Sequence, residues 1–128
     1  MFKARTGSST TKAVGDAAEA RALAFLQLQE LVLVERNYRV ARGPGARGGE
    51  IDLILRERDG TLVFVEVRAR HDAAHGGGAA SVGAAKQRAL VFAAQHYLMR
   101  LNRLPPCRFD VVALDGEQMV WLKAAFSA

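Results

Sequence analysis

Two acidic residues lie in neighbouring segments whose residue patterns are typical of β-strands. Asp52 lies in Glu50–Glu57 and Glu66 lies in Thr61–Arg70, and the short glycine-containing connection between them predicts a β-hairpin. Directly opposed residues on one face of a hairpin have β-carbons roughly 5 Å apart. Two carboxylates at that separation repel each other, and a divalent cation between them removes the repulsion. Oxygen ligands of this kind suit Mg²⁺ or Mn²⁺.

The turn between these strands decides whether the two acids meet. If residues 58–60 form a three-residue turn with the glycine in the left-handed position, Asp52 lies opposite Glu66. A two-residue turn would instead place Glu66 opposite Leu53, and the site would vanish. In the alternative, Asp52 and Glu66 form separate ion pairs with arginines and hold no metal.

The second strand of the hairpin changes from apolar to charged along its length. Leu62 and Phe64 share one face with Glu66, Arg68 and Arg70, while small and β-branched residues occupy the other face. Because both faces begin apolar, this strand is expected to be central in its sheet. Charges on such a strand are costly without partners. The same register places Glu50 opposite Arg68, which predicts an ion pair between them.

Several segments between Gly15 and Asp115 together form a specific combination. They are Gly15-Asp16-Ala17-Ala18-Glu19, Arg36-Asn37-Tyr38-Arg39, Gly49-Glu50-Ile51-Asp52-Leu53-Ile54, Phe64-Val65-Glu66-Val67-Arg68-Ala69-Arg70, Lys86 with Ala93, Ala94, Tyr97 and Leu98, and Arg108-Phe109-Asp110-Val111-Val112. The combination resembles the bacterial YraN family of uncharacterised endonuclease-like proteins. That family is similar to archaeal Holliday junction resolvases and to the wider restriction-endonuclease-like superfamily.

The resemblance implies a fold and a set of site residues. The fold is an α/β restriction-endonuclease-like core with the order α-β-β-β-α-β. Asp52, Glu66 and the backbone carbonyl of Val67 would hold the divalent metal. Glu19 matches an additional acidic residue of the resolvases, and its helical position between Leu23 and Leu26 suits an inward-pointing side chain. A solvent-exposed glutamate is the alternative. Analogy with the resolvases also implies a homodimer.

Arg68 departs from the superfamily pattern, which has a lysine at this position. Arginine effectively never loses its proton, so Arg68 is a poor general base for activating water. It can still stabilise charge that develops on a phosphate. Lys86, at the first turn of the second predicted helix, is a hypothetical substitute that approaches the same site; an ordinary helix-face lysine is the alternative.

The charge balance favours a polyanionic partner, which we expect to be nucleic acid and most simply DNA. Lysine and arginine total 18 against 13 acidic residues, a net charge of +5. Arg39, Arg42 and Arg47 lie in or beside a glycine-rich segment, where side chains and backbone amides contact phosphates well. Arg70, at the end of the charged strand, is expected to join them. Charge that only keeps the protein soluble is the alternative.

The remaining pattern predicts the elements that position these residues. Residues 1–11 are expected to form a disordered basic tail, and residues 12–128 a single nuclease-like domain. The expected elements are a helix over Thr11–Glu30, a strand over Leu31–Val40, a loop over Ala41–Gly49, the hairpin described above, a mobile loop over His71–Ala80, a helix from near Ser81 that stops before Leu104, and strands over Arg108–Asp115 and Gln118–Phe126. The connection through the second helix is long enough to join parallel strands, which gives a mixed sheet flanked by helices.

These inferences favour a metal-dependent endonuclease that acts on branched or flapped DNA. A nucleic-acid-binding module with impaired catalysis on the same scaffold is the alternative, because Arg68 leaves enzyme activity open. No apolar run is long enough to cross a bilayer, so no membrane partner is expected. Cys107 is the single cysteine and cannot form an internal disulfide, which favours the reducing cytoplasm.

Overall fold

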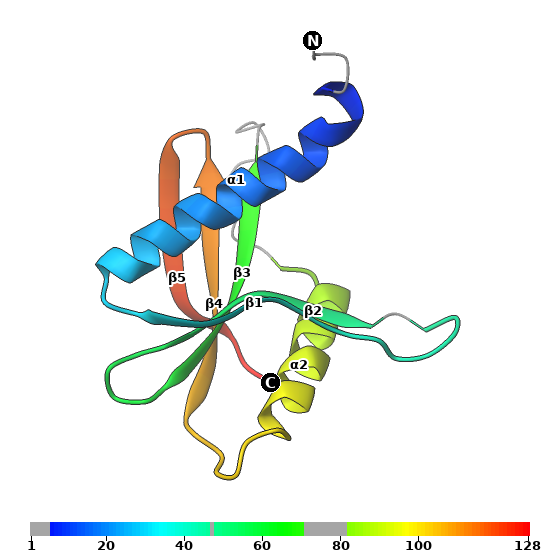
Figure 1. The fold of residues 1–128 in the computed structure, drawn as a ribbon, viewed down its shortest axis with the longest axis vertical. Helices are drawn as coiled ribbons and strands as arrows, with labels where there is room; N and C mark the ends of the chain where they lie inside the picture. Colours follow the sequence, from blue (N-terminus) through cyan, green and yellow to red (C-terminus); the bar gives the residue numbers. More distant parts are fainter. Residues whose placement is uncertain (1–5, 47, 71–81) are drawn as a thin grey trace.

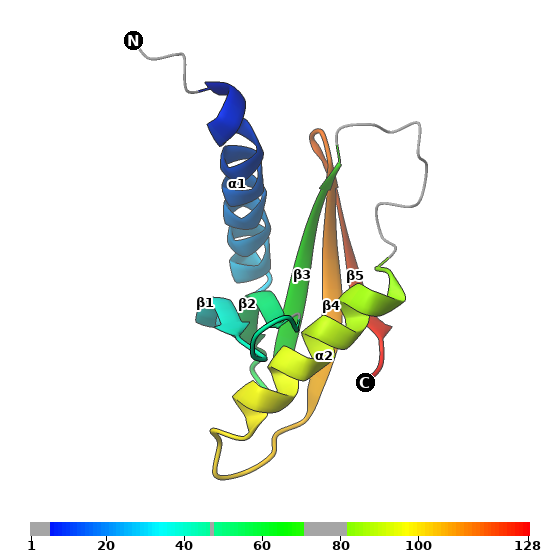
Figure 2. The same ribbon diagram turned by 90° about the vertical axis from the view of Figure 1, so that its right-hand side faces the viewer.

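The chain folds into a five-stranded mixed sheet with one helix on each face, as the two views in Figures 1 and 2 show. The computed structural model describes residues 6–46, 48–70 and 82–128. Its elements are α1 (Thr6–Leu28), β1 (Val32–Val40), β2 (Gly49–Arg56), β3 (Leu62–Arg70), α2 (Ala84–Leu98), β4 (Cys107–Asp115) and β5 (Gln118–Phe126). The strands follow the order β1-β2-β3-β4-β5, and only β3 and β4, which α2 connects, are parallel. The predicted element order and mixed sheet are confirmed.

Two apolar layers, one on each face of the sheet, hold the helices in place. Residues of α1 such as Leu26 pack with one layer, and residues of α2 such as Leu90 pack with the other. The central strand β3 contributes to both layers. Val63 and Val65 face α1, whereas Leu62 and Phe64 face α2. This alternation confirms the two faces predicted from the sequence.

The hairpin between β2 and β3 has the three-residue turn that the site requires. The Glu57 amide donates to the Thr61 carbonyl at 2.9 Å, and the Gly60 amide donates to the Glu57 carbonyl at 2.9 Å. Gly60 has φ +95°, a conformation that glycine adopts easily. Ile54 consequently pairs with Phe64, which confirms the predicted register.

The ladder between β2 and β3 is shorter than the two strands. Its last pair is Leu53 with Val65, although β2 extends back to Gly49 and β3 extends forward to Arg70. Beyond that pair, β2 stays with β1 and β3 stays with β4. Figure 1 shows β1 and β2 crossing the direction of β3. We call the opening between β2 and β3 the fork.

The fork corrects one expectation from the sequence. Glu50 was predicted to lie opposite Arg68 and to pair with it, but β2 has already left β3 at that point. The carboxylate of Glu50 instead lies 3.3 Å from Nε of Arg39, its ladder partner on β1. The ladder pairing of Asp52 with Glu66 is likewise replaced by a side-chain approach across the fork.

The two helices differ from their expected bounds. Helix α1 begins at Thr6 rather than near Thr11, so residues 6–11 are helical instead of belonging to the predicted tail. Helix α2 begins after Gly83, whose extended backbone (φ −63°, ψ 161°) keeps the preceding residues out of the helix. Residues 1–5 and 71–81, which include the whole predicted loop His71–Ala80, lie outside the described residues. Within the described chain, neither helix has the length and apolarity needed to span a bilayer.

Candidate active site

Asp52 lies at the fork and bridges it with its side chain. Its neighbours Ile51 and Leu53 are both buried but pack in opposite apolar layers. Since residues two apart on a regular strand share a face, β2 must twist strongly at Asp52. The Val67 amide on β3 donates a 2.8 Å hydrogen bond to Oδ2 of Asp52. A carboxylate therefore accepts the bond that a strand carbonyl would otherwise accept.

The carbonyl of Val67 faces the same opening. In a strand, the amide and carbonyl of one residue point to the same neighbouring strand, and the direction alternates from residue to residue. The Thr61 carbonyl accepts a bond from β2, so every second residue from Thr61 onward directs its peptide groups toward β2. Val67 is one of these residues, and β2 no longer covers it. Its carbonyl therefore points into the fork.

Glu66 is a buried carboxylate with an unsatisfied oxygen. The residue is 6% exposed, and its Oε1 has no hydrogen-bond partner among the described residues. Burial and then the negative charge of Asp52 raise its pKa to about 8. Burial also raises the pKa of Asp52, against the opposing effect of the Val67 amide. The two acids therefore repel each other unless they share a proton or a cation.

Glu19 adds a third acid from the other side of the sheet. Helix α1 packs Ala18 and Ala22 into the core, which directs the half-buried Glu19 toward the fork. Burial and then the charge of Asp52 raise the pKa of Glu19 to about 7. Glu19 therefore belongs to the same electrostatic cluster as the two strand acids.

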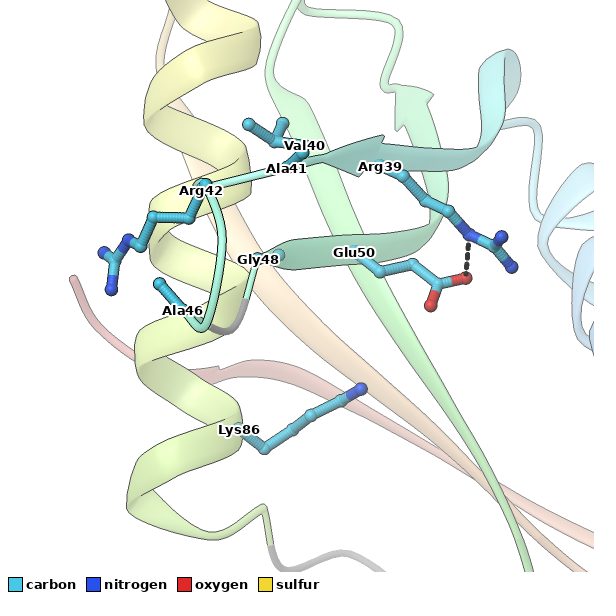
Figure 3. A pocket seen from close by; sticks show the side chains of 10 residues that line it. Arg39, Val40, Ala41, Arg42, Ala46, Gly48, Glu50 and Lys86 are labelled. Carbon is cyan, nitrogen blue, oxygen red and sulfur yellow. Dashed lines mark ion pairs between the residues drawn. The ribbon is translucent and has the colours of Figure 1, made fainter.

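Lys86 on α2 supplies the nearest amine to these acids. Its Nζ lies 3.8 Å from Oε2 of Glu66, and Figure 3 shows the side chain extending from α2 toward the strands. Both Lys86 and, more weakly, Arg68 lower the pKa of Glu66. Within the described residues, Arg68 forms no ion pair with an acid. Lys86 rather than Arg68 is therefore the closer cationic partner of the carboxylates.

Close packing of α2 on β2 brings Lys86 to the fork. A β-carbon built on Gly49 would lie 2.4 Å from the Ala89 carbonyl oxygen and 3.0 Å from the Ala93 β-carbon. The helix backbone consequently rests directly on the start of β2. Lys86 lies one helical turn before Ala89 and so projects beside Glu50.

The donor set of the fork fits a hard divalent cation. It combines the carboxylates of Asp52 and Glu66 with the Val67 carbonyl, and the unpartnered Oε1 of Glu66 is the kind of buried atom that a cation satisfies. In the part of the chain that the structure describes, no three His, Cys, Asp or Glu side chains already surround one point. An ion here would therefore be held by two carboxylates, a carbonyl and water, which is the usual arrangement for Mg²⁺.

The predicted phosphate-binding arginines differ in their surroundings. Arg39 forms the ion pair with Glu50 drawn in Figure 3, and its side chain is 74% exposed. Arg42 lines the same cavity of about 440 Å³ as Glu50 and Lys86. Arg47 and the side chain of Arg70 lie outside the described residues.

Sequence reasoning did not assign two further residues of this surface. Arg88 and Phe92 line a cavity with Arg42, and their spacing of one turn on α2 was the available signal. Asp110, by contrast, stabilises the fold rather than the site. It is fully buried and accepts hydrogen bonds from Nε of Arg108 (3.0 Å), Nε1 of Trp121 (2.9 Å) and the Ala124 amide (2.9 Å).

Comparisons with known proteins show one family. Residues 18–114 match the uncharacterised protein family UPF0102. A UPF0102 protein of Methylibium petroleiphilum is 66% identical over 119 residues, covering 93% of this chain and 98% of the relative. A UPF0102 protein of Acidovorax is 62% identical over 119 residues (93% and 88%), and one of Cupriavidus metallidurans is 58% identical over 123 residues (96% and 87%).

Proposed function

Because the chain belongs to the uncharacterised protein family UPF0102, whose description names no activity, we propose a function from its own site. That function is divalent-metal-dependent hydrolysis of phosphodiester bonds in DNA. The observation that carries it is the buried, unsatisfied carboxylate of Glu66 beside Asp52, in a fork next to a cavity lined by arginine and lysine. The element order and the parted strands support a restriction-endonuclease-like core.

The roles of the acids follow from their places. Asp52, Glu66 and the Val67 carbonyl would hold Mg²⁺ or Mn²⁺. When bound, such an ion lowers the pKa of water and neutralises charge on a phosphate. The Val67 amide fixes the Asp52 carboxylate in the fork, so this ligand is already oriented. Glu19, whose pKa is raised to about 7, would change the charge of the site near neutral pH from the α1 side.

Lys86 and Arg68 would share the two roles that a single lysine has in the superfamily pattern. Lysine, unlike arginine, has a neutral form that can accept a proton, so Lys86 would hydrogen-bond the attacking water and take up its proton. Arg68 keeps a permanent charge on the same face of β3 and stabilises the negative charge on the reacting phosphate. Arg39 and Arg42, at the rim of the cavity, contact neighbouring phosphates.

Branched or flapped DNA is the substrate class that we propose, because the motifs resemble those of junction-resolving enzymes. The purified protein is incubated with a four-way junction, a flap and a linear duplex, each with Mg²⁺ or Mn²⁺. We expect metal-dependent cleavage that prefers the branched substrates and disappears in Asp52→Ala. Cleavage that survives in Asp52→Ala would come from a contaminating nuclease and would count against the proposal.

The same experiment identifies the alternative function. Salt-sensitive binding without cleavage, under all metal conditions, would indicate a nucleic-acid-binding module that has lost catalysis. Absence of binding at low salt would reject both functions.

A further inference from the structure

A second cavity, on the flank of α2, adjoins the cavity that Arg42, Glu50 and Lys86 line beside the fork. It has a volume of about 250 Å³, and Arg42 and Gly48 line both cavities. Arg88 and Phe92 form its wall on α2, with two alanines between and beside them. We call this second cavity the α2 groove. A ligand chain that occupies the first cavity can therefore continue into the α2 groove without leaving the surface.

Three planar side chains, those of Arg42, Phe92 and His96, cluster at the edge of the α2 groove. The guanidinium carbon of Arg42 lies 4.1 Å from the centroid of the Phe92 ring. The Phe92 ring in turn contacts His96, with centroids 4.5 Å apart. Since Arg42 is exposed, the planar guanidinium that lies over Phe92 remains accessible to a ligand.

The charges of the α2 groove match an anionic ligand. Among the residues that the structure describes, neither Arg42 nor Arg88 pairs with an acidic side chain. By contrast, the neighbouring Arg39 forms an ion pair with Glu50. A ligand that combines phosphates with flat rings would satisfy both the charges and the stacking surface.

We infer that the α2 groove binds unpaired nucleotides of a nucleic-acid strand whose backbone passes the fork, with a base stacked on Arg42 and a phosphate on Arg88. Bases in a duplex stack inside the helix, so only unpaired bases reach such a surface. This inference rests on the proposed function for its choice of nucleic acid. It adds a preference for single-stranded segments that the metal site alone does not require.

Binding without cleavage tests the inference. Full-length Asp52→Asn protein in EDTA is titrated into a fluorescein-labelled oligothymidine and into a blunt duplex of the same length, and anisotropy is recorded. We expect tighter binding of the single strand. Arg42→Ala should weaken it by about 5- to 100-fold, the range for loss of one stacked base. Duplex binding should weaken less, because the duplex loses only a phosphate contact.

Charge and stacking are separated by a conservative variant. Arg42→Lys keeps the charge and removes the plane, so it should weaken single-strand binding nearly as much as Arg42→Ala. Arg56→Ala, at the opposite end of β2, is the matched control and should bind normally. Circular dichroism of each variant checks that it is folded.

Two results would overturn the inference in different ways. Equal affinity for single strand and duplex, with Arg42→Lys unchanged, would reject the stacking groove and leave the proposed nuclease intact. No binding of either DNA would reject the groove together with the proposed function.

Discussion

The amide of Val67 and the carboxylate of Asp52 form a hydrogen bond, 2.8 Å long, that a regular sheet would not contain. The bond joins the two strands at the point where their ladder has ended. It satisfies an otherwise unpaired β3 amide and at the same time orients an acid of the proposed metal site. The parting of the strands therefore leaves no unpaired amide at Val67, and it creates the space in which the Asp52 carboxylate lies.

Asp52→Asn should remove activity without unfolding the protein. The asparagine oxygen can still accept the Val67 amide, whereas the charge needed to hold a cation is lost. We expect cleavage to fall at least about 100-fold, the scale of losing one well-placed electrostatic group, with little change in Tm. Glu117→Gln, in the exposed turn before β5, is the control and should cut normally. Unreduced cleavage by Asp52→Asn would contradict the assignment.

Lys86→Ala should lower the cleavage rate by about 100- to 10,000-fold, because the variant loses the amine nearest to Glu66. Arg68→Lys alone should change the rate little. In the Lys86→Ala background, however, Arg68→Lys should restore part of the rate by placing an amine on β3. Single-turnover rates of the four proteins form a double-mutant cycle. Additive effects, or a strong gain from Arg68→Lys alone, would show that Lys86 is not the substitute.

The metal-free protein should lose stability as the pH rises from about 5 to about 8. The folded-state pKa of Glu66 is about 8 and that of Glu19 is about 7, both above the ordinary 4.5. In this interval the folded state binds more protons than the unfolded state, so the free energy of unfolding decreases with pH. Urea midpoints in EDTA measure the slope, which should be shallower in Glu66→Gln and unchanged in Glu117→Gln. An equal slope in Glu66→Gln would refute this origin.

Mg²⁺ or Mn²⁺ should raise the Tm, and the increase should be larger at pH 8 than at pH 6. A cation must displace the proton that Glu66 retains, so binding releases protons and strengthens with pH. Calorimetry in two buffers of different ionisation enthalpy measures that release, and EDTA should reverse the stabilisation. The effect should be absent in Asp52→Asn. A Tm increase of the same size in that variant would indicate binding elsewhere.

Asp110→Ala should destabilise the fold and leave the cation response in place. It removes a fully buried carboxylate that accepts bonds from Trp121 and the Ala124 amide, and it deprives Arg108 of a charged partner. Loss of one member of a buried charged pair typically costs about 3–5 kcal/mol. Denaturant unfolding measures this loss. A loss below about 1 kcal/mol would contradict the proposed structural place of Asp110.

The features predicted correctly from the sequence are those that short segments determine. Gly60 favours a left-handed turn position, and that conformation sets the register of Ile54 with Phe64. The alternating residues of β3 likewise predicted which of its side chains would face each helix. The motifs also predicted the YraN family, which is the same family as UPF0102, and the comparisons confirm it.

The features that the sequence did not predict depend on contacts between distant segments. A register counted from the turn assumes a continuous ladder, so it paired Glu50 with Arg68 and missed the parting of β2 from β3. Arg42 and Phe92 meet only after α2 has packed against β2. No local pattern reports such contacts, because they depend on how the layers assemble.

Gly49 gives this assembly a particular vulnerability. Helix α2 can approach β2 this closely only because Gly49 has no side chain, since even one methyl group would clash with the Ala89 carbonyl. This close approach sets the separation between Lys86 and Glu66. Enlarging this residue would move the helix outward and carry Lys86 away from Glu66, while every reactive group stayed chemically intact. Loss of the proposed activity can therefore arise from a change in interior volume alone.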